Sequence, residues 1–188
     1  MTRPILWTFR RCPYAMRARL AIASATIEVE LREILLREKP APFLETSPKG
    51  TVPVVDTGEQ VIEESLDVML WALEQNDPEG WLKMPGHGFD LIAKADGPFK
   101  TALDRYKYAS RHADVDVAAE QHKAGVFLQQ LERMLDDHAF LFGDTPRLAD
   151  MAILPFVRQF AHVNLAWFAA QPWTHVTRWL AAFKTSDR

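Results

Sequence analysis

The residue with the clearest chemical potential is Cys12, the only cysteine among the 188 residues of the chain. Pro13 and an Ala-rich segment follow it, so Cys12 lies where a predicted strand gives way to a predicted helix. Unpaired backbone N–H groups and the helix dipole favour an anion at such a position, and Arg11, Arg17 and Arg19 add positive charge. A small buried apolar cysteine is the commoner use of a lone Cys. The placement before Pro13 favours a reactive thiol.

A second signal is the proline in Val52-Pro53-Val54, inside a predicted strand over residues 52–55. Proline cannot donate to a sheet ladder, so it implies an edge strand or an unusual peptide geometry. A cis bond at Pro53 would leave the Val52 N–H and C=O turned outward to pair with an extended peptide. An ordinary trans proline at an edge is the alternative that spacing alone favours, since only about 5% of X–Pro bonds are cis.

A third signal is the pair Glu64-Ser65, which stands ahead of a predicted helix beginning at Leu66. Ser65 suits an N-cap, and simple capping is the commoner use of a serine here. The same helix start could bind a ligand carboxylate, and Glu64 could pair with a ligand ammonium. Lys39 and Lys49 are similar cases, because surface lysines are usually solvated.

The elements that must position these residues follow an alternating order. We predict strands over 5–9, 27–32, 52–55 and 60–62, helices over 14–25 and from 66 to about 73, and a helical turn at 43–46. Residues 27–32 alternate between apolar and charged, the period of a strand with one polar side. Met16, Leu20 and Ala23 form the apolar stripe expected of the first helix, which Pro13 suits as a first-turn residue.

Strand signals stop at the turn-rich residues 76–80, and everything downstream has helical period. We therefore predict two domains, residues 1–75 and 87–188, joined by a linker over 76–86. The second is predicted to be all-helical, with helices over 89–109 (interrupted at Gly97-Pro98), 115–138, 148–164 (kinked at Pro155) and 173–183. The aromatic residues Phe99, Tyr106, Trp167 and Trp173 could line a substrate pocket, but at helical spacing they are more often core.

Composition excludes several classes of protein. One cysteine cannot form an internal disulfide, and the apolar runs fall short of the ~20 residues of a membrane-spanning helix. A net charge of −3 gives no global field toward nucleic acid or acidic membrane. We expect no nucleic-acid or membrane partner and a cytoplasmic location. We also expect no metal, because no HExxH motif and no i, i+4 pair occurs among the histidines: His87, His112, His122, His138, His162 and His175.

Taken together, these segments resemble a known family. The run Arg11-Cys12-Pro13-Tyr14-Ala15, then Lys39-Pro40, Val52-Pro53-Val54 and Glu64-Ser65, resembles the thioredoxin-like domain of cytosolic glutathione transferases, in particular the omega-like cysteine-type enzymes. Residues 143–150 (GDTPRLAD) look like the segment that starts the core helix of the family's helical domain. The implied fold is α/β plus all-α: a β-α-β-α-β-β-α domain followed by an all-helical one.

The resemblance also implies roles for individual residues. Cys12 would be the catalytic thiol that forms a mixed disulfide with glutathione, the co-substrate, and Tyr14 would take the aromatic place beside it. Val52, with Pro53 in cis, would offer its backbone to the cysteinyl part of glutathione. Glu64 and Ser65 would hold the γ-glutamyl end, and Lys39 the glycyl end. An extended tripeptide that adds to a sheet edge makes these roles physically coherent. A homodimer and a small electrophilic or disulfide substrate are implied as well.

Two departures from the family pattern matter. Ala15 stands where dithiol glutaredoxins have a second cysteine, so thiol exchange must be monothiol, with a second glutathione resolving the intermediate. Arg147 stands where the family usually has a Ser or Thr that caps the core helix. Its side chain cannot accept from the Asp150 N–H, although Asp150 can still reach back to the Arg147 N–H. This departure concerns stability rather than chemistry.

The sequence therefore predicts a glutathione-dependent thiol transferase or reductase. One alternative is glutathione conjugation or isomerisation, whose mark is activity that survives Cys12→Ala. The other, of a different class, is a noncatalytic binding or regulatory protein of the same fold.

Overall fold

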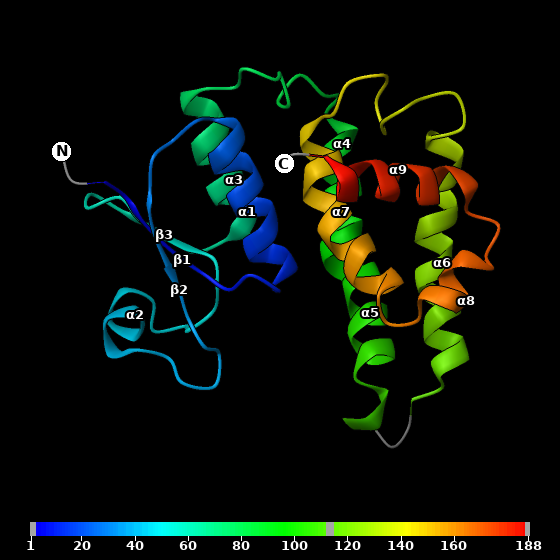
Figure 1. Ribbon diagram of the computed structural model, residues 1–188, viewed down its shortest axis with the longest axis horizontal. Helices are drawn as coiled ribbons and strands as arrows, with labels where there is room; N and C mark the ends of the chain where they lie inside the picture. Colours follow the sequence, from blue (N-terminus) through cyan, green and yellow to red (C-terminus); the bar gives the residue numbers. More distant parts are fainter. Residues whose placement is uncertain (1–2, 112–114, 187–188) are drawn as a thin grey trace. The chain divides into compact units, whose positions relative to one another are not determined.

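The structure is a computed structural model that describes residues 3–111 and 115–186 (Figure 1). His112, one of the histidines considered above, lies outside the described residues. The chain forms two compact units, Met1–Leu82 and Lys83–Arg188. Their division falls within the segment 76–86 for which a linker is predicted.

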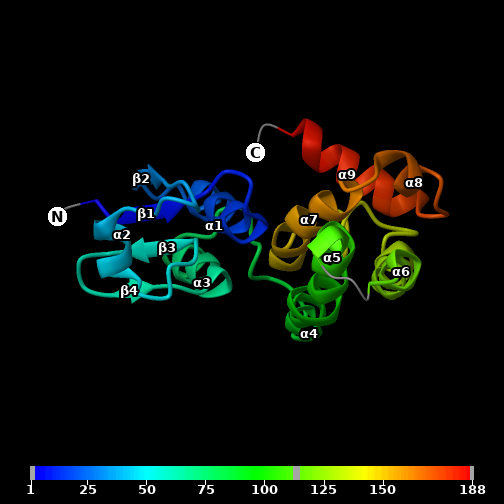
Figure 2. The ribbon, with the colours of Figure 1, turned by 90° about the horizontal axis from the view of Figure 1, so that it is seen from below.

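The first unit is a four-stranded mixed sheet with helices. Its elements are β1 (Ile5–Thr8), α1 (Pro13–Ser24), β2 (Glu30–Glu33), α2 (Ala41–Thr46), β3 (Val54–Asp56), β4 (Val61–Ile62) and α3 (Ser65–Gln75). The strand order is β2-β1-β3-β4, with β1 parallel to β2 and antiparallel to β3, and with β3 antiparallel to β4. Helices α1 and α3 lie side by side on one face of the sheet (Figures 1 and 2). This arrangement confirms the predicted thioredoxin-like order of elements.

The buried face of α1 differs from the predicted one. Met16, Leu20 and Ala23 are partly or fully exposed, whereas Ala15, Ala18, Ala21 and Ile22 are buried. The reason is the close packing of α1 against α3, which small alanine side chains permit and longer ones would prevent. The prediction that Met16, Leu20 and Ala23 mark the buried face of α1 is therefore wrong.

The second strand is confirmed but its bounds differ, since β2 runs over Glu30–Glu33 instead of the predicted 27–32. Parallel pairing with β1 sets the register, with Ile5 opposite Glu30. β2 is an edge strand, and Leu31 is 53% exposed rather than in the core. The first side chain to return to the core after the strand is Ile34.

Pro53 does not lie inside a strand, which corrects the edge-strand prediction. β3 begins one residue later, at Val54, and it lies between β1 and β4 rather than at an edge. The Val52–Pro53 peptide bond is cis, as the resemblance implies. Val52 and Val54 are buried together with Trp7 and Phe43, whose ring centroids are 5.5 Å apart, so the proline segment packs into the core beside α2.

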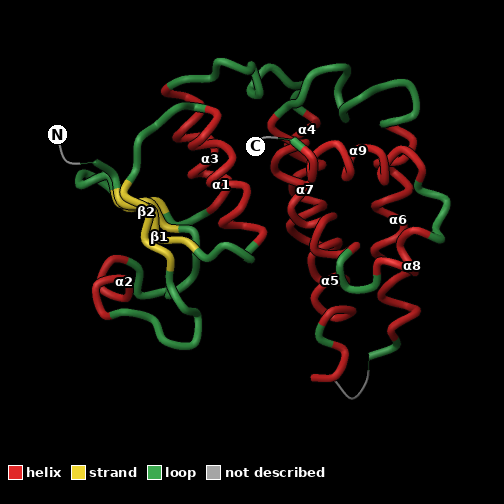
Figure 3. The backbone as a smooth tube through the Cα atoms, viewed as in Figure 1, coloured by secondary structure: helices red, strands yellow, loops and turns green. Residues whose placement is uncertain are grey.

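The second unit consists of helices (Figure 3). They are α4 (His87–Lys94), α5 (Lys100–Lys107), α6 (Val117–Met134), α7 (Leu148–Ala161), α8 (Leu165–Ala169) and α9 (Thr174–Thr185), with a short 3₁₀ turn at Ala109–Arg111. The expected interruption at Gly97-Pro98 is instead a π-helical turn, Ala95–Phe99, that joins α4 to α5. An extra residue per turn accommodates the missing N–H of Pro98. Likewise, α7 continues through Pro155 and ends before residue 164, where α8 follows.

An aromatic cluster forms much of the core of the second unit. Phe99, Tyr106 and Trp173 are buried, and Phe160 packs against two of them, with ring centroids 5.6 Å from Phe99 and 5.5 Å from Tyr106. The core interpretation of these residues is therefore confirmed. Trp167 is only partly buried and remains accessible at the edge of the cluster.

In the part of the chain that the structure describes, every helix is too short or too polar to cross a membrane.

Candidate active site at the start of α1

Cys12 occupies the N-cap position of α1, with φ −79° and ψ 122°. Its backbone N–H donates to Phe9 O at 3.0 Å, and its carbonyl accepts from Met16 N at 2.9 Å, which closes the first helical turn. The Cys12 side chain makes no cap hydrogen bond to this helix start. The thiol is free and only partly buried. The sulfur therefore lies at the positive end of the helix dipole, where an anion is favoured.

The carbonyl of Val52 is the polar neighbour of the thiol, since Cys12 Sγ lies 3.7 Å from Val52 O. That separation is typical of a weak contact between sulfur and a carbonyl oxygen. Val52 is 8% exposed. The structure thus brings Cys12 and the cis-proline segment together, although they are forty residues apart in the sequence.

Ser65 and Tyr14 are connected through Arg17, a buried arginine of α1. The Arg17 Nε–H donates to Ser65 Oγ at 3.0 Å, and the guanidinium carbon lies 5.3 Å from the centroid of the Tyr14 ring. Arginine is almost never fully buried unless it is paired. Ser65 is the first residue of α3, and Glu64 is at the N-cap position, so the capping role predicted for Ser65 is wrong.

A serine hydroxyl has one donor and two acceptor sites. Because Arg17 donates to Ser65 Oγ, the hydroxyl proton is left to point elsewhere. The start of α3 therefore presents backbone N–H groups, a serine O–H and a buried cation at one place. This combination suits a carboxylate.

Glu64 and Lys39 have different surroundings from Ser65. The carboxylate of Glu64 forms an exposed ion pair with Lys49, and this partner raises the pKa of Lys49. Lys39 is exposed, and it makes no ion pair with any residue in 3–111 or 115–186. Its ammonium lies close to Gly50, where an added Cβ would be 3.1 Å from Lys39 Nζ. The structure thus pairs Glu64 with Lys49 and places the Lys39 ammonium beside Gly50.

Arg19 braces the turn between β1 and α1. Its guanidinium donates to Thr8 Oγ1 at 2.6 Å and to Arg10 O at 3.1 Å. Burial lowers the pKa of Arg19, and the nearby Glu33 and Cys12 oppose that fall. The backbone that leads to Cys12 is therefore held by a charged side chain from the helix that Cys12 begins.

Sequence reasoning missed the role of Arg17, which it treated only as one of three positive charges. A usable signal was present, because an arginine between Ala15 and Ala18 falls on the small-residue face that packs inward. No group of three or more His, Cys, Asp or Glu side chains that could hold a metal ion occurs among the described residues. The site can supply a nucleophilic sulfur and a place for a carboxylate.

Two family models match the chain. Residues 6–81 match the N-terminal domain of glutathione S-transferases, and residues 127–182 match the C-terminal domain. The first match lies in the first unit, and the second match covers the C-terminal part of the second unit.

Individual relatives agree with these models. Glutathione S-transferase DHAR2 of Arabidopsis thaliana is 30% identical over 77% of this chain and 64% of its own length, so the chain spans less than two thirds of it. Glutathione S-transferase omega-1 of Mus musculus is 25% identical, over 85% of this chain and 68% of that protein. Maleylacetoacetate isomerase of Rhizobium meliloti is 28% identical, over 81% and 79%.

Among solved structures, a glutathione transferase family member from Pseudomonas fluorescens, with two glutathione bound, has a TM-score of 0.83. It is 15% identical, and the match covers 98% of this chain and 89% of that chain. At this identity the comparison supports the fold alone.

Proposed function

Because the chain belongs to the glutathione S-transferase family, we propose that it is a glutathione-dependent thiol transferase that works through Cys12 alone. The observation that carries the proposal is the position of Cys12. Its free, partly exposed sulfur stands at the uncapped start of α1 and beside the carbonyl of Val52. Glutathione transferases that conjugate noncovalently do not need a sulfur there.

The proposed reaction has two thiol–disulfide exchanges. The Cys12 thiolate attacks the glutathione sulfur of a mixed disulfide, so the Cys12–glutathione S–S bond forms while the substrate's S–S bond breaks. The substrate leaves as a thiolate and takes a proton from solvent. A second glutathione, as its thiolate, then attacks the glutathione sulfur bound to Cys12. Glutathione disulfide leaves, and the Cys12 thiolate is restored. Ala15 supplies no second thiol, so the resolving thiol must come from glutathione.

Glutathione is proposed to lie along the segment between the thiol and the start of α3. The backbone of Val52, before the cis Pro53, would pair with the cysteinyl part. Ser65, held by Arg17, would donate to the γ-glutamyl carboxylate, and Glu64 would accept from its ammonium. Since Glu64 is paired with Lys49, this ammonium must compete with or displace that lysine.

Tyr14 and Lys39 complete the proposed set. Tyr14 lies against Arg17 and two residues after the thiol, where its ring can cover the bound sulfur. Lys39 has an exposed ammonium without an ion-pair partner among the described residues, and would pair with the glycyl carboxylate. A homodimer, a small electrophilic or disulfide substrate and a cytoplasmic location belong to the same proposal.

The decisive experiment is intact mass spectrometry after incubation with oxidised glutathione, with Cys12→Ser as the paired variant. We expect one glutathione adduct on the wild-type chain and none on the variant. If the wild-type chain takes up no adduct although Cys12 reacts with a general thiol reagent, thiol exchange is rejected. Failure to bind immobilised glutathione would favour the noncatalytic alternative.

A second candidate is glutathione-dependent isomerisation, which the likeness to maleylacetoacetate isomerase favours. Isomerisation needs glutathione as a bound nucleophile rather than a mixed disulfide with the protein. Substitution of Cys12 therefore distinguishes the two functions. An isomerase or conjugation activity that persists in Cys12→Ala would support this second candidate.

A further inference from the structure

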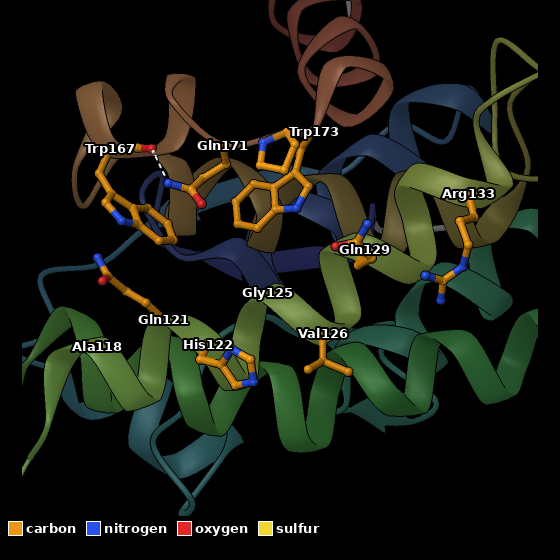
Figure 4. Close-up of a pocket in the computed structure, with 11 residues that line it drawn as sticks. Ala118, Gln121, His122, Gly125, Val126, Gln129, Arg133, Trp167, Gln171 and Trp173 are labelled. Atoms are coloured by element: carbon orange, nitrogen blue, oxygen red, sulfur yellow. Dashed lines mark hydrogen bonds between the residues drawn. The ribbon is translucent and has the colours of Figure 1, made fainter.

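We propose that the second unit carries a binding site for a small, flat aromatic carboxylate, between α6 and the segment that joins α8 to α9. A pocket of about 520 Å³ opens there, within the usual range for small-molecule sites. Figure 4 shows the indoles of Trp167 and Trp173 on one side of it and the side chains of α6 on the other. All residues that line the pocket belong to this unit, so the proposal does not depend on the function proposed for Cys12.

The apolar part of the pocket is aromatic. The Trp167 and Trp173 rings meet edge to face with centroids 5.7 Å apart. Trp173 is 4% exposed and belongs to the core, whereas Trp167 is partly exposed. The partly exposed indole of Trp167 offers a rigid surface against which a planar ring can lie, and Trp173 adds only its small accessible part. This geometry favours a flat aromatic body over an aliphatic chain.

Gly125 is the second feature that points to a ligand. It lies in the middle of α6, where glycine is a poor helix former. Its φ is not positive, so its backbone conformation does not require glycine. A Cβ at this position would lie 3.4 Å from Trp173 Cζ2, an ordinary contact that an alanine could make. Packing therefore does not exclude alanine at position 125. The absence of a methyl group there leaves space that belongs to the pocket.

The polar lining has one sign of charge. None of the described residues that line the pocket is Asp or Glu, although the whole chain has a net charge of −3. Arg133 lines it and makes no ion pair with any described residue. The amide of Gln171 donates from Nε2 to Trp167 O at 3.1 Å. A guanidinium and amide N–H groups in a pocket lined by two indoles suit an aromatic ring that carries a carboxylate.

The test is isothermal titration calorimetry of the full chain with 2-naphthoate and, in parallel, with the uncharged 2-naphthamide. We expect Gly125→Ala to weaken both ligands about tenfold while it raises the midpoint of thermal unfolding by a few degrees. We expect Arg133→Gln to weaken 2-naphthoate about fivefold and to leave 2-naphthamide unchanged. Gly97→Ala, a glycine substitution into open space elsewhere in the same unit, is the matched control and should leave both affinities unchanged.

Any one of the following results would contradict the proposed site. The first is no binding of 2-naphthoate to the wild-type chain at millimolar concentration, and the second is wild-type affinity in Gly125→Ala. The third is an equal loss of both ligands in Arg133→Gln, which would indicate a general disturbance instead of a contact with the carboxylate. Cys12→Ser should bind 2-naphthoate as the wild type does. A loss of binding in that variant would place the ligand near the thiol and not in this pocket.

Discussion

The first turns of α1 and α7 differ in how many hydrogen bonds their polar side chains make. At α7, the buried Asp150 accepts from Leu141 N at 2.9 Å, Arg147 N at 2.8 Å and Trp179 Nε1 at 3.1 Å. At α1, Cys12 makes no side-chain cap, and its sulfur has one weak contact with Val52 O. The carboxylate at the start of α7 is therefore fully hydrogen-bonded, whereas the thiol at the start of α1 can still make further contacts.

The difference separates a structural polar group from a chemical one. A carboxylate that accepts three hydrogen bonds has little remaining capacity to bind a ligand. Its removal leaves the three N–H donors without an acceptor. A thiol with one long contact costs little to remove and remains open to attack. Ser65 is intermediate, because Arg17 occupies one of its acceptor sites and its proton is uncommitted. We therefore expect substitutions at α7 to alter stability and substitutions at α1 and Ser65 to alter chemistry.

The largest effect should come from Cys12→Ser. Without the sulfur nucleophile, thiol transfer to glutathione should fall by about 10³-fold or more. Stability should change little, because serine is itself a good N-cap residue. Steady-state assays and thermal unfolding of the same samples measure both. Retention of most of the transfer activity would show that the thiol at the start of α1 is not the reactive group.

Asp150→Ala should produce the largest loss of stability. Three N–H donors would lose their acceptor, two of them buried, so the free energy of unfolding should fall by about 3–5 kcal/mol. Urea unfolding measures this loss. Asp116→Ala is the matched control, since Asp116 caps the exposed start of α6 through Ala118 N and Ala119 N, and should cost about 1 kcal/mol. Equal losses in the two variants would mean that the buried carboxylate of Asp150 contributes no more than an exposed helix cap.

The same carboxylate should give the protein a specific pH dependence. Burial raises the pKa of Asp150 to about 6, and the three N–H donors oppose that rise. Between the ordinary value near 3.8 and about 6, the folded chain holds a proton here that the unfolded chain has released. The stability contribution of Asp150 should therefore be largest at low pH and should fall as pH rises through this window.

The measurement is the difference in free energy of unfolding between the wild-type chain and Asp150→Asn, which cancels the other titrating groups. Two pKa units correspond to roughly 2–3 kcal/mol, so this difference should shrink by that order from pH 4 to pH 6.5. If the difference stays constant or grows with pH, the carboxylate is already ionised in the folded state at pH 4.

A smaller effect is expected from substitutions that remove the hydrogen bond between Arg17 and Ser65. If Arg17 directs the Ser65 proton toward a γ-glutamyl carboxylate, Ser65→Ala should weaken glutathione binding about tenfold, and Arg17→Lys several-fold. The double variant should bind about as weakly as Ser65→Ala alone, because the arginine acts through the serine. Cysteinylglycine, which lacks the γ-glutamyl group, should be unaffected.

Two results decide this arrangement. Additive losses, or an equal loss for cysteinylglycine, would mean that Arg17 supports the fold and does not orient Ser65. Arg178→Lys is the matched control in the second unit, where Arg178 donates to Leu135 O and His138 O. It should leave glutathione affinity unchanged.

Local patterns predicted the parts of the fold that depend on local chemistry. The placement of Cys12 before Pro13 and the helical period beyond residue 80 could both be read along the chain. The start of β2 could not, because pairing with β1 sets its register. The buried face of α1 could not either, because a second helix selects small residues over large ones.

The candidate site divides in the same way. The thiol has a local signature, whereas the contact between Arg17 and Ser65 joins residues 48 apart, and no periodicity reports it. The pair of Glu64 with Lys49 and the exposed edge of Trp167 are likewise products of packing. The family resemblance named the residues at the ends of the proposed ligand, but it did not identify the side chain that holds Ser65.

The smallest expected effect concerns Arg147, the N-cap residue of α7, whose side chain offers no hydrogen-bond acceptor. Arg147 receives no benefit from its own side chain as a cap, since a guanidinium has only donors, and it puts positive charge at the positive end of the α7 dipole. Arg147→Ser should supply the missing acceptor and raise the free energy of unfolding by about 1 kcal/mol. Arg147→Ala, which removes the charge but adds no acceptor, separates the two causes in urea unfolding. Equal gains in both variants would assign the effect to charge, whereas a loss in both would mean that other contacts of the arginine outweigh the cap.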